Sequence, residues 1–335
     1  MRLTQLAMCL ALLLSAVASG QEVPLSGEST VVFYDRPTAA AFLQESDVFT
    51  SATSALERKM RLRTDAEVSE SGLLKYQSDQ ALDWTASEID ELRESIKACH
   101  ELLAKWKLPL PRSIPLIKTT GKEEGGAAYT RRAAVILPES MLRSSGRDLQ
   151  PLLLHELFHV LSRHNPELRK EMYAIIGFEP CGTGKLPVDI EEHKVTNPDA
   201  PTYDYAISLT IDGRAGKYLP VIRSKSTIAM QGFLIRQLDF LLMEIDGDGQ
   251  RWQPVLDGGQ PTLLPISHKA YEAKIGRNTG YTIHAEEVLA DNFSLFIRDQ
   301  LNVPSPEILE KLRDVLRKTA GNPSELESLE AKTSQ

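Results

Sequence analysis

The sequence predicts an α+β protein that is predominantly helical, with a small antiparallel sheet and a separate hairpin-rich insertion. Three observations predict this architecture. Helical periodicity dominates residues 37–106 and returns from residue 268 onward. Only two β-like runs precede residue 150, and both are short. Asp-Gly turn signals gather between residues 177 and 267, which predicts that the insertion occupies about that range.

The N-terminal part of the chain, residues 21–108, reads as a helical region. Its best-defined element is a helix that begins at Thr85, because Thr85-Ala-Ser-Glu88 forms a capping box. Leu108-Pro-Leu-Pro111 ends this helix near Lys107, since proline cannot continue it. Two β-like runs then follow at 113–118 and 129–137, and they make up the predicted small sheet.

A strongly apolar helix comes next. Asp148 is placed to cap it, and Pro151 lies in its first turn, where a missing N–H costs little. Asn165-Pro166 ends this helix and begins another, which we expect to reach about Ile176.

The insertion at about 177–267 is predicted from turn signals between β-like runs. The turns are Asp212-Gly213, residues 246–249 and residues 257–259, and the runs are 205–211, 218–223 and 240–245. Asp246-x-Asp248 is similar to the start of a calcium-binding loop, but Arg251 stands where an EF-hand requires glycine, so we interpret it as a turn. Helices resume near His268, and the last runs from Pro306 to about Lys318. The polar tail, residues 319–335, is expected to be disordered.

The first 20 residues have the pattern of a secretory signal peptide. Arg2 precedes an apolar run from Leu6 to Val17, and small residues follow, which predicts cleavage near residues 18–20. The run is too short to span a membrane, and no later stretch reaches the roughly 18 apolar residues that a span requires. We therefore expect an exported protein, either periplasmic or secreted.

Charge and cysteine content limit the partners further. A net charge of −8 argues against nucleic acid or an anionic membrane surface as a partner. Cys99 and Cys181 would remain after cleavage; an oxidising compartment allows them to pair, and two separate buried thiols are an equal alternative. The oligomeric state stays open.

The apolar helix carries His155-Glu156-Leu-Phe-His159. Residues four apart lie on one helical face, so both imidazoles can bind one metal ion, and zinc favours neutral imidazole nitrogen in four-coordinate geometry. Glu156 lies beside that position, where it can accept a proton from zinc-bound water. The alternative is a core helix with hydrogen-bonded, metal-free histidines. Apolar residues surround the motif, so these polar groups should be buried and need partners, which a metal supplies.

A third ligand must come from elsewhere. His164 does not match the metzincin spacing, which would place a histidine at Asn165 and a glycine at Ser162. Glu287 and Asp291 form an i, i+4 pair, so one can bind the metal while the other accepts a hydrogen bond from a ligating histidine. Adjacent helical residues point about 100° apart, so only one of Glu286 and Glu287 can face the metal, and only Glu287 has a carboxylate one turn away. The alternative is a solvated acidic first turn, favoured by the helix dipole.

These two motifs resemble those of the gluzincins, the thermolysin-like branch of the HExxH zinc metallopeptidases. The resemblance implies a zincin-like metallopeptidase domain at residues 109–318, with His155, His159 and Glu287 as zinc ligands and Asp291 orienting a histidine. It covers only the two short segments. The stretch between His159 and Glu287 is far longer than in thermolysin, so the resemblance also implies a large insertion between the two metal-binding helices.

If the resemblance holds, the protein hydrolyses peptide bonds in a peptide or protein substrate, with Glu156 as general base. A second donor should stabilise the oxyanion, and the candidates are His284, Tyr281, Tyr205 and Tyr203. The run 127–137 would be the edge strand that binds an extended peptide, or else an ordinary interior strand. Two other classes stay open: a zinc hydrolase acting on a non-peptide substrate, and a secreted binding or regulatory protein with a degenerate site.

Overall fold

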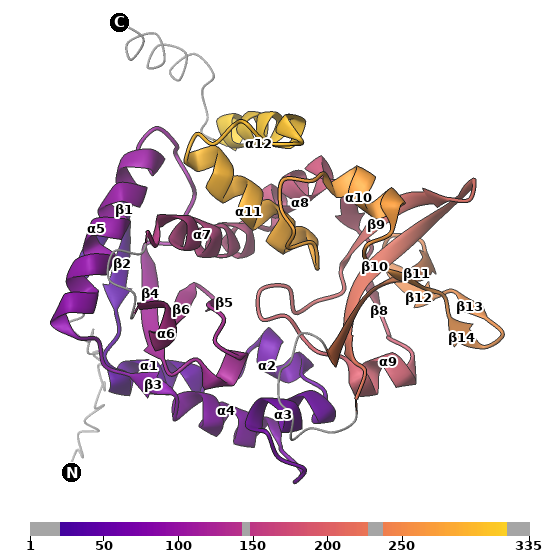
Figure 1. The fold of residues 1–335 in the computed structure, drawn as a ribbon, viewed down its shortest axis with the longest axis horizontal. Helices are drawn as coiled ribbons and strands as arrows, with labels where there is room; N and C mark the ends of the chain where they lie inside the picture. Colours follow the sequence, from indigo (N-terminus) through magenta and orange to yellow (C-terminus); the bar gives the residue numbers. More distant parts are fainter. Residues whose placement is uncertain (1–20, 143–147, 227–236, 320–335) are drawn as a thin grey trace, which may run out of the picture.

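The computed structural model describes residues 21–142, 148–226 and 237–319, and within them two β-sheets flank a group of central helices (Figure 1). The first sheet has six strands. Its order is β1 (Glu22–Ser26), β2 (Ser29–Phe33), β4 (Ser113–Thr119), β6 (Ala134–Pro138) and β5 (Tyr129–Arg131), and β3 (Ala81–Leu82) pairs with β4 beside this path. β2, β4 and β6 run parallel, and the remaining pairs are antiparallel. This order leaves β5 at one edge of the sheet.

The parallel strands are apolar and buried because both faces of the sheet are covered. On one face, Val31, Leu116 and Val135 belong to the main core together with residues of the helices α5 (Ala86–Leu103) and α7 (Gln150–His164). On the other face, Ile117 and Ile136 pack against α1 (Arg36–Leu43). The remaining short helices of this half are α2 (Val48–Ala52), α3 (Ala55–Leu62), α4 (Glu70–Ser78), the 3₁₀ turn η1 (Lys122–Glu124) and α6 (Glu139–Leu142).

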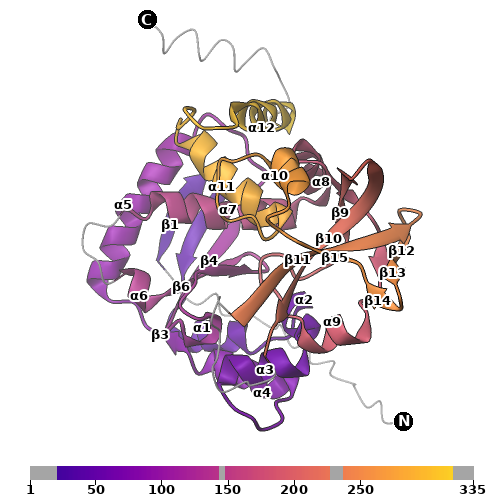
Figure 2. The same ribbon diagram turned by 45° about the vertical axis from the view of Figure 1, so that its right-hand side comes forward.

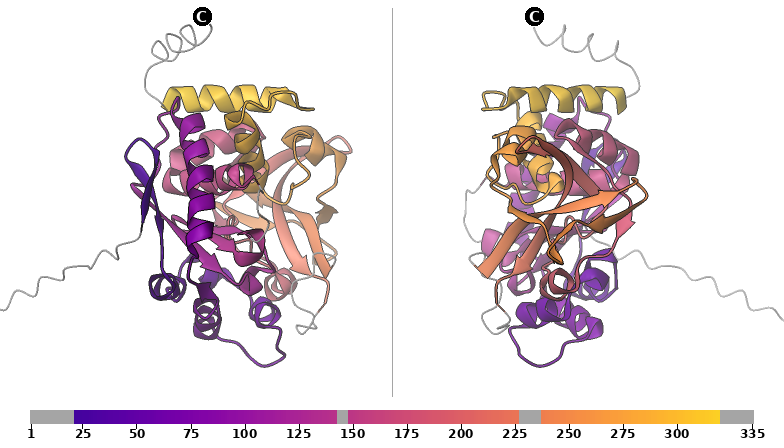
Figure 3. Two further views of the ribbon diagram at one scale, coloured as in Figure 1. Left: turned by 60° about the vertical axis from the view of Figure 1, so that its left-hand side comes forward. Right: turned by 90° about the vertical axis from the view of Figure 1, so that its right-hand side faces the viewer.

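The central helices place the candidate ligands. α7 packs against α11 (Ala285–Ile297) and α5, and α8 (Pro166–Ile175) follows α7 directly. α12 (Pro306–Thr319) packs on α8 and α11 and lies across one end of the molecule (Figure 3). α10 (Lys269–Ile275) precedes α11 and contacts the second sheet.

The second sheet has seven strands and lies on the opposite side of the central helices (Figure 2). Its order is β7 (Phe178–Pro180), β9 (Tyr205–Ile211), β10 (Arg214–Ser224), β11 (Leu238–Gly247), β12 (Arg251–Pro254) and β8 (Thr183–Gly184), with β15 (Leu263–Pro265) on β11. A two-stranded ribbon, β13 (Leu256–Asp257) and β14 (Gln260–Pro261), extends from it, and α9 (Val188–His193) packs on β10.

The predicted fold class is wrong. The protein is a mixed α/β structure with two large sheets, not a predominantly helical one with a small antiparallel sheet. The first sheet is larger than expected because residues 22–33, which were expected to contain no strand, form β1 and β2, and β2 pairs with β4. The run 129–137 is two strands, because Arg132 adopts a positive φ of 51° and turns the chain. The insertion does contain hairpins, β9–β10, β11–β12 and β13–β14, and the first two belong to one seven-stranded sheet.

Several local predictions are confirmed. The capping box at Thr85 begins α5, and Asp212-Gly213 joins β9 to β10 with positive φ at both residues. Asp248 accepts two backbone N–H bonds within a turn, as expected in place of a calcium loop. Asp148 accepts the N–H of Gln150, although the helix itself begins from Leu149. The two described cysteines, Cys99 and Cys181, are buried free thiols, so they do not pair.

Two predictions fall on parts of the chain that the structure does not describe. The signal peptide at residues 1–20 lies outside the described residues, and so do residues 320–335 of the predicted tail. Among the residues that are described, no helix is both long enough and apolar enough to cross a membrane.

Candidate metal centre

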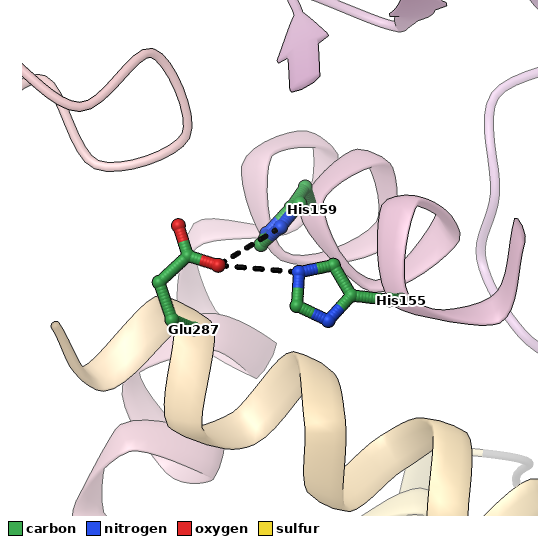
Figure 4. Close-up of side chains that lie close together, drawn as sticks. All are labelled: His155, His159 and Glu287. Carbon is green, nitrogen blue, oxygen red and sulfur yellow. Dashed lines mark hydrogen bonds and ion pairs between the residues drawn. The ribbon is translucent and has the colours of Figure 1, made fainter. Parts of the chain in front are cut away.

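Three side chains from two distant segments meet where α7 crosses α11 (Figure 4). His155 and Glu287 are 132 residues apart in sequence, yet His155 Nε2 lies 3.2 Å from Glu287 Oε2. His159 Nε2 lies 3.6 Å from the same oxygen. The two imidazoles therefore direct the same type of nitrogen at one carboxylate oxygen. This is the arrangement that sequence analysis predicted for His155, His159 and Glu287.

The apolar faces of the two helices explain why these polar groups meet. Leu154, Phe158 and Leu161 of α7 are fully buried, as are Val288, Leu289 and Phe293 of α11, and all of them belong to the same core. The two histidines and Glu287 lie on the remaining part of each helix surface, where α7 and α11 face each other. His159 and Glu287 are 0% and 1% exposed, whereas 14% of the His155 side chain reaches solvent.

Each histidine has its own carboxylate on the outer side of the ring. His155 Nδ1 donates to Asp291 Oδ1 at 2.8 Å, as the i, i+4 spacing predicted. His159 Nδ1 donates to Glu286 Oε1 at 3.0 Å. A carboxylate on Nδ1 selects the tautomer whose Nε2 carries a free lone pair, and this is the form that binds a metal.

The inner side of the site holds an unsatisfied polar atom. His159 Nε2 is buried and has no hydrogen-bond partner among the described residues. One ligand atom from each of His155, His159 and Glu287 can be chosen so that all lie within 4.8 Å of one another. Buried polar groups normally find a partner, and two imidazole nitrogens with one carboxylate oxygen form a donor set that zinc accepts. The residues present therefore fit a zinc ion.

The electrostatics of the cluster favour a cation. Burial lowers the pKa of His159, but the charges of Asp199 and Glu287 and the bond to Glu286 outweigh it and raise the pKa to about 9. The pKa of His155 is raised well above its ordinary value, because its bonds to Asp291 and Glu287 overcome the effect of burial. Burial would raise the pKa of Glu287, yet the two histidines hold it near 2.

Glu156 lies next to the three candidate ligands. It is buried, and Thr130 on the edge strand β5 donates its hydroxyl to Glu156 Oε2 at 2.9 Å. Burial raises the pKa of Glu156 against the opposing effect of the two histidines. A proton-accepting carboxylate beside a metal position can serve as a general base.

A second group of possible ligands shares His159. One atom each of Glu156, His159 and Asp199 also lie within 4.8 Å of one another. Because His159 Nδ1 is bonded to Glu286, only Nε2 can bind an ion, and one nitrogen cannot serve both groups. Asp199 Oδ1 already accepts the N–H of Thr130 at 2.8 Å, and Glu156 already accepts the Thr130 hydroxyl. The group with Glu287 fits better, since it contains the Nε2 atoms of both histidines.

A cleft of about 590 Å³ opens onto the site from the side of His155. Apolar side chains of Met141, Leu152 and Leu295 form much of its wall, and Arg298 supplies a cation. Tyr281, one of the four candidate oxyanion donors, lines this cleft and stacks on the His155 ring with centroids 6.3 Å apart. The cleft has room for a flexible chain beside the ligands.

The other three candidate donors lie elsewhere. His284, Tyr203 and Tyr205 line a separate cavity of about 170 Å³ on the far side of Asp199 and Glu286. Burial lowers the pKa of His284 to about 4, so its ring is neutral near pH 7. Tyr205 packs against Tyr173 and Arg169. The structure thus brings Tyr281, and not these three, into the cleft with Glu156.

β5 is the edge strand of the first sheet, but some of its outward-facing backbone groups already have hydrogen-bond partners. Thr130 N–H donates to Asp199, and Thr130 C=O accepts from Arg163 Nη1 at 3.1 Å. An added strand cannot use these two groups. Ala127 and Ala128, just before β5, line the cleft.

Sequence analysis assigned no role to several residues of the site, namely Thr130, Asn197, Asp199 and Glu286. The side chain of Glu286 points about 100° away from that of Glu287, and no carboxylate follows Glu286 one helical turn later. The residue spacing therefore gave no reason to assign Glu286 a role in the site. Asn197 and Asp199 lie on an irregular segment between α9 and β9, and no periodicity relates that segment to α7. The only available signal was the run Thr196-Asn197-Pro198-Asp199, which is polar but otherwise reads as a turn.

Comparisons of this chain with protein-family models, with curated proteins and with solved structures found no match. The functional assignment therefore depends on the residues of the site.

Proposed function

We propose that the protein is an exported zinc-dependent metallopeptidase of the gluzincin type. The observation that carries the proposal is the convergence of His155, His159 and Glu287 on one point, with the Nε2 atom of a fully buried histidine left without a partner. Glu156 beside that point, and an open cleft in front of it, supply the other two features that hydrolysis needs.

The proposed roles follow from position. His155, His159 and Glu287 hold the ion, while Asp291 and Glu286 fix the rings of the two histidines. A zinc ion bound there would polarise a substrate carbonyl and lower the pKa of bound water. Glu156 takes the proton of the attacking water and returns it to the leaving amine, held for this by the Thr130 hydroxyl. Tyr281 is placed to donate a hydrogen bond to the oxyanion.

The decisive experiment compares Glu156→Gln with wild type. Glutamine keeps the size of the side chain and can still accept the Thr130 hydroxyl, but it cannot act as a base. Zinc content should stay at one ion per chain, and hydrolysis of a peptide library should fall by several orders of magnitude. Glu171→Gln, an exposed change on α8, is the matched control and should retain full activity.

The same assay separates the alternatives. Cleavage that a chelator abolishes and zinc restores supports a metallopeptidase. Zinc-dependent hydrolysis of esters or amides without any peptide cleavage would indicate a hydrolase with another substrate. If wild type binds zinc but hydrolyses nothing, and Glu156→Gln changes no property, the site belongs to a binding protein.

A further inference from the structure

We infer that Asn197 is a positioning residue that turns Glu287 so that only one of its carboxylate oxygens faces the two histidines. The inference deepens the proposed function and depends on the same metal site. It assigns a catalytic consequence to a residue that lies outside both metal-binding helices.

The contacts of Glu287 divide between its two oxygens. Asn197 Nδ2 donates to Oε1 at 2.5 Å, whereas Oε2 is the atom that faces the Nε2 atoms of His155 and His159. Asn197 and Glu287 are both buried. Because the amide holds Oε1 on the side away from the histidines, the carboxylate plane cannot rotate freely, and Oε2 alone is presented to an ion.

The amide of Asn197 is itself held in place. Its Oδ1 accepts the N–H of Asp199 at 3.0 Å, which fixes the side chain and assigns Nδ2 as the atom directed at Glu287. Arg163 donates to the carbonyls of Pro198 and Asp199 at 3.3 Å each. The segment after Asn197 is thus anchored to α7, the same helix that carries both histidines.

The segment before Asn197 is anchored by a buried ion cluster, which also joins α3 to η1. Arg61 is buried on α3 and donates to the carbonyl of Thr196 at 3.1 Å. Glu57, also buried, accepts the Thr196 hydroxyl at 2.9 Å and pairs with Arg61 at 2.7 Å. A buried charge cluster is costly unless its members are mutually satisfied, so these bonds hold the segment firmly. Asn197 is therefore preorganised before any ion binds.

Coordination through one oxygen has a chemical consequence. Catalytic zinc sites use three protein ligands and keep a further position open for water or substrate, whereas structural sites are closed by four protein ligands. If both oxygens of Glu287 were free to turn toward the ion, the second would compete for the open position. Asn197 thereby keeps the site in the open form that hydrolysis requires.

The test replaces Asn197 with leucine, which has nearly the same shape but no donor, and with alanine as a second variant in case leucine does not fold. Each protein is loaded with Co²⁺ in place of zinc, and its visible absorption is recorded, because the bands weaken as coordination rises from four to five. We expect both variants to bind metal with weakened bands. With zinc, kcat/KM for a peptide should fall about 10–100-fold, the range typical of changes to residues that orient metal ligands.

A control separates positioning from a general loss of structure. Asn165 ends α7 and donates to the carbonyls of Pro109 and Leu161 at 2.7 and 2.8 Å, so Asn165→Leu also removes a partly buried amide. It should lower stability toward urea while leaving the cobalt spectrum and kcat/KM unchanged. A structural role for Asn197 would make its variants behave in the same way.

The outcomes distinguish this inference from the proposed function. If wild type binds metal and cleaves peptides while the Asn197 variants keep the wild-type spectrum and kcat/KM, the role of Asn197 is refuted and the peptidase stands. If wild type takes up no metal, the ligand site fails, and the role of Asn197 fails with it.

Discussion

Glu286 should connect the stability of the protein with its affinity for metal, and removing its carboxylate tests this directly. The side chain is 2% exposed and accepts three hydrogen bonds. The donors are His159 Nδ1 at 3.0 Å, Ser162 Oγ at 2.5 Å and the hydroxyl of Tyr173. All three donors are buried, and the Ser162 hydroxyl also lies 3.3 Å from the carbonyl of His159, so loss of the carboxylate would leave His159 Nδ1 and the Tyr173 hydroxyl without a protein acceptor.

The magnitude follows from the two donors that would keep no acceptor. A buried donor without an acceptor costs about 1–3 kcal/mol, so Glu286→Ala should lose roughly 2–6 kcal/mol of unfolding free energy. That loss reaches the lower end of the total stability of an ordinary domain, about 5–15 kcal/mol, so this variant should be partly unfolded. Glu286→Gln keeps one acceptor oxygen and the side-chain volume, and should lose about 1–3 kcal/mol, close to the cost of one unsatisfied group.

Two measurements check the prediction for Glu286→Gln. Urea unfolding of the metal-free protein gives the change in stability, and competition with a chromophoric chelator gives the zinc affinity, which should fall about 10–100-fold. Glu272→Gln, an exposed change in the first turn of α10, is the control and should alter neither. A Glu286→Gln protein with wild-type stability and affinity would show that the carboxylate does not orient His159.

Three further outcomes are expected. Asp291→Ala should lower zinc affinity about 10–100-fold, measured by chelator competition, but stability by only about 1 kcal/mol, because 35% of the Asp291 side chain reaches solvent and water can replace it. Free zinc at 1,000 times its dissociation constant should raise the unfolding free energy by about 4 kcal/mol in urea titrations, and a chelator should remove the gain. Cys99 and Cys181 should react with a thiol reagent only after denaturation and without any reductant, since both are buried and unpaired; a reductant requirement would contradict the structure.

The pairing of the candidate ligands within each helix could be predicted because that geometry is local. An i, i+4 spacing on a helix decides that His155 and His159 share a face, and it decides the same for Glu287 and Asp291, whatever the rest of the chain does. Only the meeting of the two pairs required long-range information. The turn at Asp212-Gly213 was likewise predictable, because positive φ at both positions is a property of the two residues themselves.

The sheets could not be predicted at the same level. Ser29–Phe33 is a short apolar run, and nothing within it shows that its parallel partner is β4, more than seventy residues later. Parallel strands buried on both faces lack the alternation that marks an antiparallel strand. The hairpins of the second sheet could be predicted but their union in one sheet could not, because turn signals reveal connections between neighbours and not the pairing of β7 with β9 or of β8 with β12.

Glu286 shows how a correct local argument can still miss a role. Neighbouring helical residues point about 100° apart, so Glu287 and Glu286 cannot both face the ion. Because of the same angle, the Glu286 carboxylate lies on the Nδ1 side of the His159 ring, away from the Nε2 atom that faces Glu287. The direction that excludes Glu286 as a ligand is therefore the one that makes it a partner for the second histidine, and this becomes visible only when the crossing of α7 and α11 is known.

The charge of the site implies that the proposed metal ion would also affect the stability of the protein. Five carboxylates surround two imidazoles, those of Glu156, Asp199, Glu286, Glu287 and Asp291, and most of them are buried. Burial is the main cause that raises the pKa of Asp199 to about 7, and repulsion by Glu156 and Glu287 adds to it against the opposing charge of His159. A divalent cation at the centre would relieve that repulsion, so its binding free energy becomes part of the folding free energy. We therefore expect a bound metal ion to add to the stability that the hydrogen bonds of these carboxylates already give the folded state.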